Sequence, residues 1–173
     1  MRHAVAVSDS PSQWRTWLNS LHADRRASAE CLRLRFEALG AADADDRARS
    51  EVMENLPHLA RFALLRSLWR APIDGWADPG AFAGLPAAQR LLAAGADEDD
   101  LVRLARAVAY EAVFGTLDEL DSGGELNASA MDVGWIVMES GEDGAPTGRA
   151  LAGLHEDLLT SDPSGRDGAD LWR

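Results

Sequence analysis

The apolar residues of roughly the first 120 positions recur at helical spacing, and this pattern constrains the fold more than any other feature of the sequence. The first stripe follows Ser10–Pro11, a helix cap with a proline in the first turn. It consists of Trp14, Trp17, Leu18 and Leu21. Intervals of three and four residues place these side chains on one side of a helix. The sequence therefore predicts a largely helical chain.

Further helices are expected where the same spacing continues between turn-forming residues. They cover residues 27–39, the stretch from Leu56 to Pro72, residues 86–92 and residues 98–120. Two questions stay open. The segment 41–50 is either a loop or an exposed helical turn, and nothing in residues 23–28 forces a break between the first two helices.

The segment 98–120 is predicted to be the longest helix and the centre of the fold. Asp97 is a suitable N-terminal cap for it. We expect its apolar face, which comprises Leu101, Leu104, Ala105, Val108 and Ala112, to be buried. The narrow opposite stripe comprises Arg103, Arg106 and Tyr110. Phe114 and Leu117 turn that stripe apolar, so we expect another part of the chain or a partner to cover the C-terminal half of the helix.

After residue 125 the apolar period changes from helical to alternating, which is typical of strands. A strand is expected over 133–138, a turn over 141–144, a returning strand over 147–151 and a short helix over 154–160. The predicted fold class is mainly α (α+β): a bundle of five or six helices with a C-terminal β-hairpin and a short closing helix. We expect a single domain over 1–173, with a helical part (1–121) and an acidic hairpin-and-tail part (122–173).

The charge is strongly acidic and unevenly distributed. The 173 residues include 29 acidic and 17 basic side chains, a net charge of −12, and every basic one is an arginine. The absence of lysine excludes a Walker A loop, a pyridoxal-phosphate Schiff base and a Ser–Lys dyad. Nucleic-acid binding is not expected, because phosphate contacts need an excess of positive charge. Residues 115–173 hold three arginines and 13 acidic residues, a net of −10.

Several sequence patterns that would indicate secretion, a membrane span, a cofactor or a metal site are absent. Cys31 is the only cysteine, so no intrachain disulfide can form. No signal-peptide pattern and no run of about 20 apolar residues is present, so a cytoplasmic protein without membrane contact is expected. No glycine-rich phosphate loop follows a strand, and the four histidines show no metal-ligand spacing. We therefore expect no cofactor and no metal.

The C-terminal segment carries the most distinctive pattern. It consists of Trp135, Asp143-Gly144-Ala145-Pro146, Gly153-Leu154-His155-Glu156, Leu158-Leu159 and Asp162-Pro163-Ser164-Gly165-Arg166. It resembles the C-terminal half of a group of small bacterial proteins for which no activity is established, and the likeness extends more weakly to residues 95–111. The resemblance implies a bacterial source and a shared fold, and no particular reaction.

Six residues are candidates for binding a protein partner: Trp76, Trp135, His155, Glu156, Asp162 and Arg166. Trp76 lies in a loop rich in Gly, Pro and Asp, where it either contacts a partner or covers the helical core. Residues 162–165 fit a type I turn, which would bring Arg166 toward nearby carboxylates. In the functional interpretation, the last four candidates converge near the hairpin.

Two classes of function remain. The favoured one is a non-enzymatic protein that binds a protein partner through its acidic C-terminal region, whose charge favours a basic partner. The exposed face of the 133–138 strand also predicts a homodimer. The alternative is a small hydrolase or other enzyme that uses His155 and Glu156 with His58. It requires His155 to lie within hydrogen-bond reach of a second titratable group in a pocket.

Overall fold

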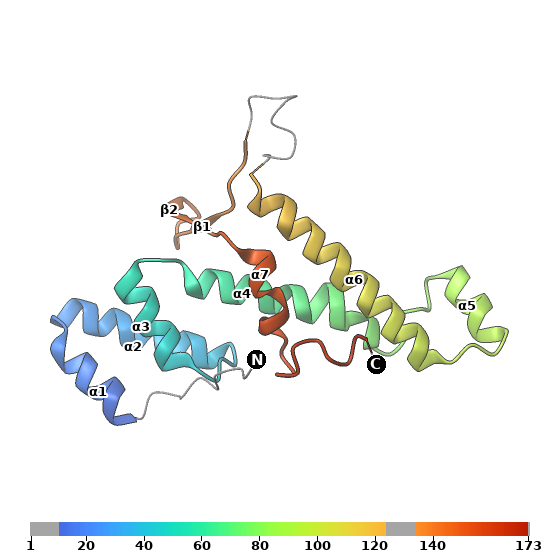
Figure 1. Cartoon of the computed structure of the whole chain (residues 1–173), viewed down its shortest axis with the longest axis horizontal. Helices are drawn as coiled ribbons and strands as arrows, with labels where there is room; N and C mark the ends of the chain where they lie inside the picture. The colour runs from blue at the N-terminus through green and yellow to red at the C-terminus, as the bar shows by residue number, and fades with distance from the viewer. Residues whose placement is uncertain (1–10, 124–133, 173) are drawn as a thin grey trace, which may run out of the picture. The chain divides into compact units, whose positions relative to one another are not determined.

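A computed structural model describes residues 11–123 and 134–172 (Figure 1). Its helices are α1 (Pro11–Ser20), α2 (Ala23–Ala38), α3 (Ala44–Glu54), α4 (His58–Leu68), α5 (Pro86–Ala93), α6 (Glu98–Asp121) and α7 (Leu154–Leu158). The strands β1 (Met138–Ser140) and β2 (Pro146–Ala150) precede α7. The predicted class is confirmed: in the described residues, six helices are followed by an antiparallel hairpin and a short closing helix.

The chain forms two compact units, each built from two stretches of sequence. Unit 1 comprises residues 1–61 and 138–150, and unit 2 comprises residues 62–137 and 151–173. The division falls inside α4 and separates the hairpin from the tail that follows it. It therefore does not coincide with the boundary expected at residue 121. That the whole chain acts as a single domain stays a prediction.

Helices α1 and α2 are separate, and Arg26 explains why the chain can break between them. Its Nε donates to the carbonyl oxygen of Leu18 at 3.0 Å, and its Nη2 donates to that of Leu21 at 3.2 Å. Leu18 lies in the last turn of α1, where its carbonyl oxygen also accepts the N–H of Leu21 at 3.1 Å, and Leu21 directly follows the helix. The guanidinium adds hydrogen bonds to carbonyl groups at this end of α1 and contributes to its stability.

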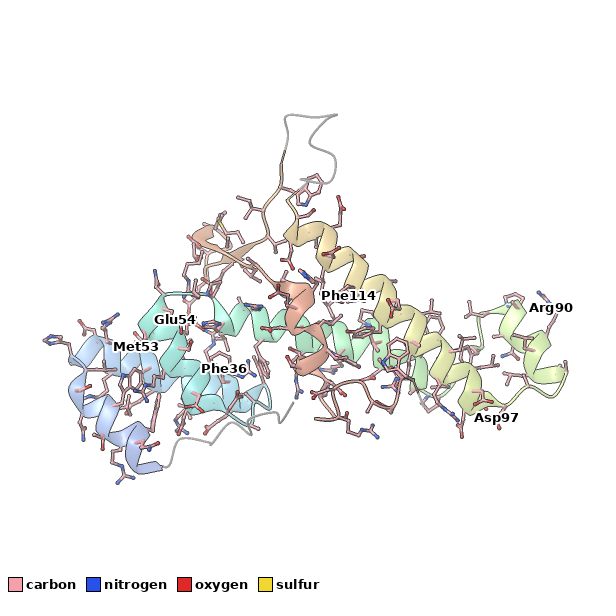
Figure 2. All side chains as sticks on the ribbon, in the orientation of Figure 1. Phe36, Met53, Glu54, Arg90, Asp97 and Phe114 are labelled. Carbon is pink, nitrogen blue, oxygen red and sulfur yellow. The ribbon has the colours of Figure 1, made fainter. Side chains whose placement is uncertain are left out.

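The segment 41–50 is mostly helical, because α3 begins at Ala44. Helix α3 packs on α2 through small side chains, with Ala29, Ala44 and Ala48 all buried. Phe36 is fully buried in the same unit (Figure 2). Small residues let two helix backbones approach closely, and Phe36 belongs to the core beside them. Cys31, by contrast, is exposed on α2.

The hairpin is shorter than expected. Of the predicted strand 133–138, residue 133 lies outside the described residues, residues 134–137 are not strand, and β1 begins at Met138. An irregularity lies between Met138 and Ser140, where the pairing with β2 shifts. The predicted turn is confirmed by a hydrogen bond of 3.0 Å from Gly144 N–H to the Gly141 carbonyl.

In unit 2 the helix that carries Phe62 and Leu65 on its buried face changes form after Leu68, and Pro72 lies in the turn that follows. Proline has no N–H and cannot continue the α-helical ladder. Residues Trp69–Ile73 form a π-helical turn, and Asp74–Ala77 form a 3₁₀ turn. The π-helical turn packs against α6 and buries Trp69 and Ile73 completely.

Helix α6 starts at the predicted cap. Asp97 Oδ1 accepts the N–H groups of Asp99 at 2.9 Å and Asp100 at 3.2 Å, and Asp97 stands at the beginning of α6 (Figure 2). Of the helices that the structure describes, none combines the length and the apolar character needed to cross a bilayer.

The expected orientation of α6 is wrong for its apolar face and right for its C-terminal half. Tyr110 of the opposite stripe is buried, and Leu117, on the side expected to be covered, is buried as well. Leu104 and Val108, predicted to be core, are 61% and 60% exposed. The polar stripe can face inward because its polar groups have partners in unit 2: Arg106 lies between two carboxylates, and Tyr110 packs on Trp69 with ring centroids 5.7 Å apart. Burial of a charge is tolerated where it is paired.

Candidate functional site

The outer face of α6 carries a line of exposed apolar residues. It consists of Leu104, Val108, Ala112 and Gly115, which we call the α6 stripe. The spacing of four, four and three residues puts them in one line along the helix. All four are exposed, with large side chains at one end and small ones at the other. Exposed apolar surfaces of this kind mark interaction sites.

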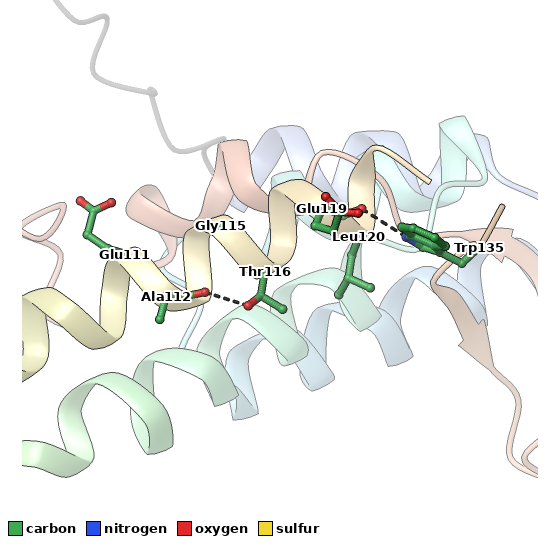
Figure 3. A pocket seen from close by; sticks show the side chains of 7 residues that line it. All are labelled: Glu111, Ala112, Gly115, Thr116, Glu119, Leu120 and Trp135. Carbon is green, nitrogen blue, oxygen red and sulfur yellow. Dashed lines mark hydrogen bonds between the residues drawn. The ribbon is translucent and has the colours of Figure 1, made fainter. Parts of the chain in front are cut away.

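A shallow groove of about 540 Å³ continues the small-residue end of the stripe (Figure 3). Its lining consists of Glu111, Ala112, Gly115, Thr116, Glu119, Leu120 and Trp135. The indole Nε1 of Trp135 donates to the carbonyl oxygen of Glu119 at 3.2 Å, which fixes the ring beside the last turn of α6. The groove thus combines an aromatic wall, a floor of small residues and two carboxylates.

The unit that carries the stripe and the groove is also the acidic one. Unit 2 contains seven arginines and 17 acidic residues, a net of −10, whereas unit 1 contains ten arginines and 12 acidic residues, a net of −2. A surface of one charge sign attracts partners of the other sign and speeds their encounter.

His155 is paired with Asp121 at the end of α6. Asp121 Oδ2 lies 2.7 Å from His155 Nδ1 and also accepts the backbone N–H of His155 at 3.0 Å. Phe114 contacts the imidazole edge-to-face at 5.6 Å. A carboxylate that accepts from Nδ1 leaves Nε2 as the basic nitrogen. Nε2 lies 3.8 Å from Asp118 Oδ1, beyond hydrogen-bond distance.

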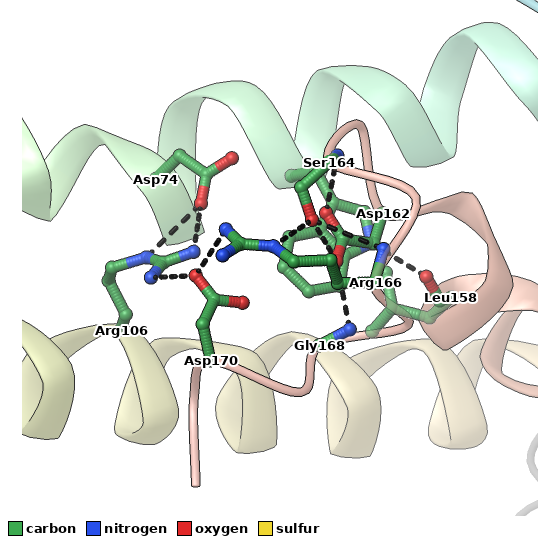
Figure 4. Close-up of polar contacts among 9 residues, drawn as sticks. Asp74, Arg106, Leu158, Asp162, Ser164, Arg166, Gly168 and Asp170 are labelled. Carbon is green, nitrogen blue, oxygen red and sulfur yellow. Dashed lines mark hydrogen bonds and ion pairs between the residues drawn. The ribbon is translucent and has the colours of Figure 1, made fainter. Parts of the chain in front are cut away.

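The remaining predicted tail residues do not converge on His155. Asp162 is buried and accepts the N–H groups of Ser164 and Gly168, each at 2.8 Å (Figure 4). Glu156 is exposed. Asp162 and Arg166 do share a partner, because both contact the Ser164 hydroxyl. These contacts hold the tail in its turn.

Arg166 pairs with a carboxylate as predicted, and the pair belongs to a larger cluster. Asp170 Oδ2 accepts from Arg166 Nη2 at 3.0 Å and from Arg106 Nη1 at 2.8 Å, while Arg106 Nη2 donates to Asp74 Oδ1 at 2.7 Å (Figure 4). Burial alone would lower the pKa of Arg106, but the hydrogen bonds to Asp170 and Asp74 outweigh it and raise this pKa. The hydrogen bond from Arg106 lowers the pKa of Asp170.

The two tryptophan candidates differ in role. Trp76 is half-buried and stacks on Phe82 with ring centroids 5.8 Å apart, so packing accounts for its position in the loop. Trp135 lines the groove. Trp135 therefore borders an open surface groove.

Unit 1 holds a charge cluster that the sequence did not indicate. Arg149 on β2 donates to Glu139 at 2.5 and 2.8 Å and to Glu51 at 3.2 Å. Glu51 is only 3% exposed, and its second oxygen accepts the N–H of Leu59 at 2.7 Å. His58, the third residue of the enzymatic alternative, also belongs to unit 1, where its Nε2 lies 3.2 Å from the Ser50 hydroxyl.

No three His, Cys, Asp or Glu side chains gather as a metal ion would require within residues 11–123 and 134–172. A scan against protein-family models and searches of the curated proteins and of the solved structures find no match to this chain.

Sequence reasoning identified Trp135 and His155 but missed the α6 stripe as a surface and Asp121 as the partner of His155. The spacing shows the stripe as an apolar face and predicts that it is buried, which is wrong. A usable signal is the position of Arg106 on the same side as Tyr110 and Leu117, where Leu117 already predicts a covered surface. An arginine among aromatic and aliphatic residues on one helix face indicates a buried ion pair as readily as a solvated stripe.

Proposed function

We propose that this protein acts without catalysis, by binding a basic protein partner on the outer face of α6. The observation that carries the proposal is the exposure of Leu104 and Val108 in one line on a unit with a net charge of −10. Apolar contact supplies affinity, and complementary charge supplies encounter rate and specificity. The likeness of the C-terminal pattern to small bacterial proteins supports a partner from a bacterial cell.

The test compares how wild type and two variants capture partner proteins, with the substituted side chains matched in their exposed fraction. Val108 and Met53 are each 60% exposed, the former on the α6 stripe and the latter on α3 in unit 1. Wild type and each variant are used to capture proteins from a lysate of the source cell. The candidate partner set consists of the proteins that wild type and Met53→Glu retain and that Val108→Glu does not. We expect this set to be basic and its retention to fall at about 0.5 M salt, where charge attraction is screened within a few ångströms.

Circular dichroism of Val108→Glu should match that of wild type, because the side chain it replaces makes few contacts. An empty difference set contradicts the proposal. So does a set that is acidic or insensitive to salt.

The pair of His155 and Asp121 supports a second candidate, a hydrolase in which His155 Nε2 is the general base. A carboxylate at 2.7 Å from Nδ1 orients an imidazole for this role. The described groove, however, is lined by residues 111–120 and Trp135 and does not include His155. The test is the hydrolysis of p-nitrophenyl acetate. Activity that both His155→Gln and Asp121→Asn abolish would favour this candidate, whereas a hydrolysis rate with wild type equal to that in buffer alone would exclude it.

A further inference from the structure

The groove at the C-terminal half of α6 has the features of a cation site. Gly115 forms its floor, with Glu111 one helical turn before it and Glu119 one turn after it. Residues four apart on a helix lie on the same face, so both carboxylates flank the space above Gly115. A Cβ atom at Gly115 would meet nothing within 4 Å, which shows that this space is open.

Nothing in the described lining neutralises the two carboxylates. None of the seven lining residues is basic, and no ion pair of Glu111 or Glu119 is found within residues 11–123 and 134–172. The arginines of α6 are engaged elsewhere, Arg103 with Asp100 and Arg106 with Asp74 and Asp170. The last turn of α6 adds the partial negative charge of a helix C-terminus.

The aromatic wall selects among cations. The ring of Trp135 is held at the end of the groove by the hydrogen bond from its Nε1 to the Glu119 carbonyl at 3.2 Å (Figure 3). Its backbone N–H donates to the Gly123 carbonyl at 3.3 Å. A tryptophan face attracts cations, and a planar guanidinium both stacks on it and pairs with carboxylates. An ammonium group can pair with the carboxylates, but it has no planar surface to stack on the ring.

We propose that this groove binds the guanidinium of an arginine side chain presented by the partner. The inference rests on the proposed function, because it assigns the anchoring residue of the basic partner that the α6 stripe contacts. The groove volume of about 540 Å³ accommodates an arginine side chain together with part of the segment that carries it. The apolar remainder of that segment lies on Val108 and Leu104.

The test uses small probes in place of the partner. The Trp135 indole N–H resonance, assigned with Trp135→Phe, is followed in ¹H–¹⁵N spectra while Nα-acetyl-arginine methylamide is added. The matched control is the citrulline analogue, which has nearly the same shape and no charge. We expect saturable shifts with the arginine probe at about millimolar Kd and binding of the citrulline probe at least about tenfold weaker.

Variants locate the site. Gly115→Leu fills the open space and should abolish the shift, and Glu119→Gln should weaken binding about fivefold. Glu142→Gln, at an exposed position of the hairpin turn, should leave it unchanged. Equal shifts with the citrulline probe, no shift with either probe, or unchanged binding in Gly115→Leu would each overturn the proposal. Partner capture that depends on Val108 and survives Gly115→Leu would retain the proposed function while rejecting the arginine site.

Discussion

Units 1 and 2 solve the same problem with similar chemistry. Each must hold together two stretches of chain that are distant in sequence, and each does so with an arginine between two carboxylates. In unit 1, Arg149 of the hairpin reaches Glu51 on α3. In unit 2, Arg106 on α6 reaches Asp170 of the tail. In both cases the hydrogen bonds to the carboxylates raise the pKa of the arginine despite its burial.

The two units differ in their net charge and in the apolar residues that they expose. Unit 1 is close to neutral, whereas unit 2 retains a net charge of −10 and exposes Leu104 and Val108 on its longest helix. Stability alone does not require either property. An excess of one charge beside exposed apolar surface is what a binding surface needs, and the comparison therefore directs attention to unit 2.

The largest expected effect is on the core of unit 2. Trp69 is fully buried, and its Nε1 donates to the carbonyl oxygen of Leu158 at 2.6 Å. We expect Trp69→Ala to reduce the free energy of unfolding by about 4 kcal/mol, because it removes a large ring and leaves a cavity. Urea unfolding followed by circular dichroism measures the change.

The matched variant for unit 1 is Phe36→Ala, which also removes a fully buried ring. If the units are energetically separate, each variant lowers only one of two unfolding transitions seen by calorimetry. A single transition lowered by both variants would show that the two units unfold together, and the comparison would then describe one cooperative structure.

The two arginine clusters should differ in strength. Glu51 is almost inaccessible, so Arg149→Met leaves a buried carboxylate without its charge partner. We expect a loss of about 3 kcal/mol for Arg149→Met and about 2 kcal/mol for Arg106→Met, whose partners are more exposed. Paired urea titrations measure both. Equal losses, or a larger loss for Arg106→Met, would reverse the ranking.

The smallest expected effect is a difference in acid sensitivity. The pKa of Asp170 is lowered in the folded protein by the hydrogen bond from Arg106. A carboxyl group with a lowered folded pKa contributes stability above its unfolded pKa and loses it as pH falls through the folded value. Asp170→Asn should therefore reduce stability at pH 7 and have less effect below about pH 3. A loss that is the same at both pH values would contradict this account.

Local features of the fold were predictable because they depend on residues close in sequence. Asp97 as a cap, Pro86 at the start of α5 and the turn ending at Gly144 need only neighbouring groups. The break between α1 and α2 was not predictable by the same means. It depends on Arg26 reaching back eight residues to the Leu18 carbonyl, a contact that the apolar spacing does not encode.

The candidate site was predictable only in part, and for the same reason. Trp135 and His155 stood out by residue type, but their partners lie 16 and 34 positions away, at Glu119 and Asp121. The orientation of α6 was decided by Asp74 and Asp170, which lie 32 and 64 positions from Arg106. Periodicity identifies the two faces of a helix and gives no account of distant charge partners.

Because each unit is built from two stretches of sequence, neither unit can be completed in the order in which the chain is synthesised until its second stretch has been made. The hairpin leaves and rejoins unit 2 at one place, since Leu151 N–H donates to the Val137 carbonyl at 2.9 Å. Residues 1–61 emerge from the ribosome early, yet Arg149 arrives only after most of unit 2 has been made. The carboxylate of Glu51 therefore cannot pair with the Arg149 guanidinium until residue 149 has been synthesised. Completion of both units therefore depends on residues 138–173.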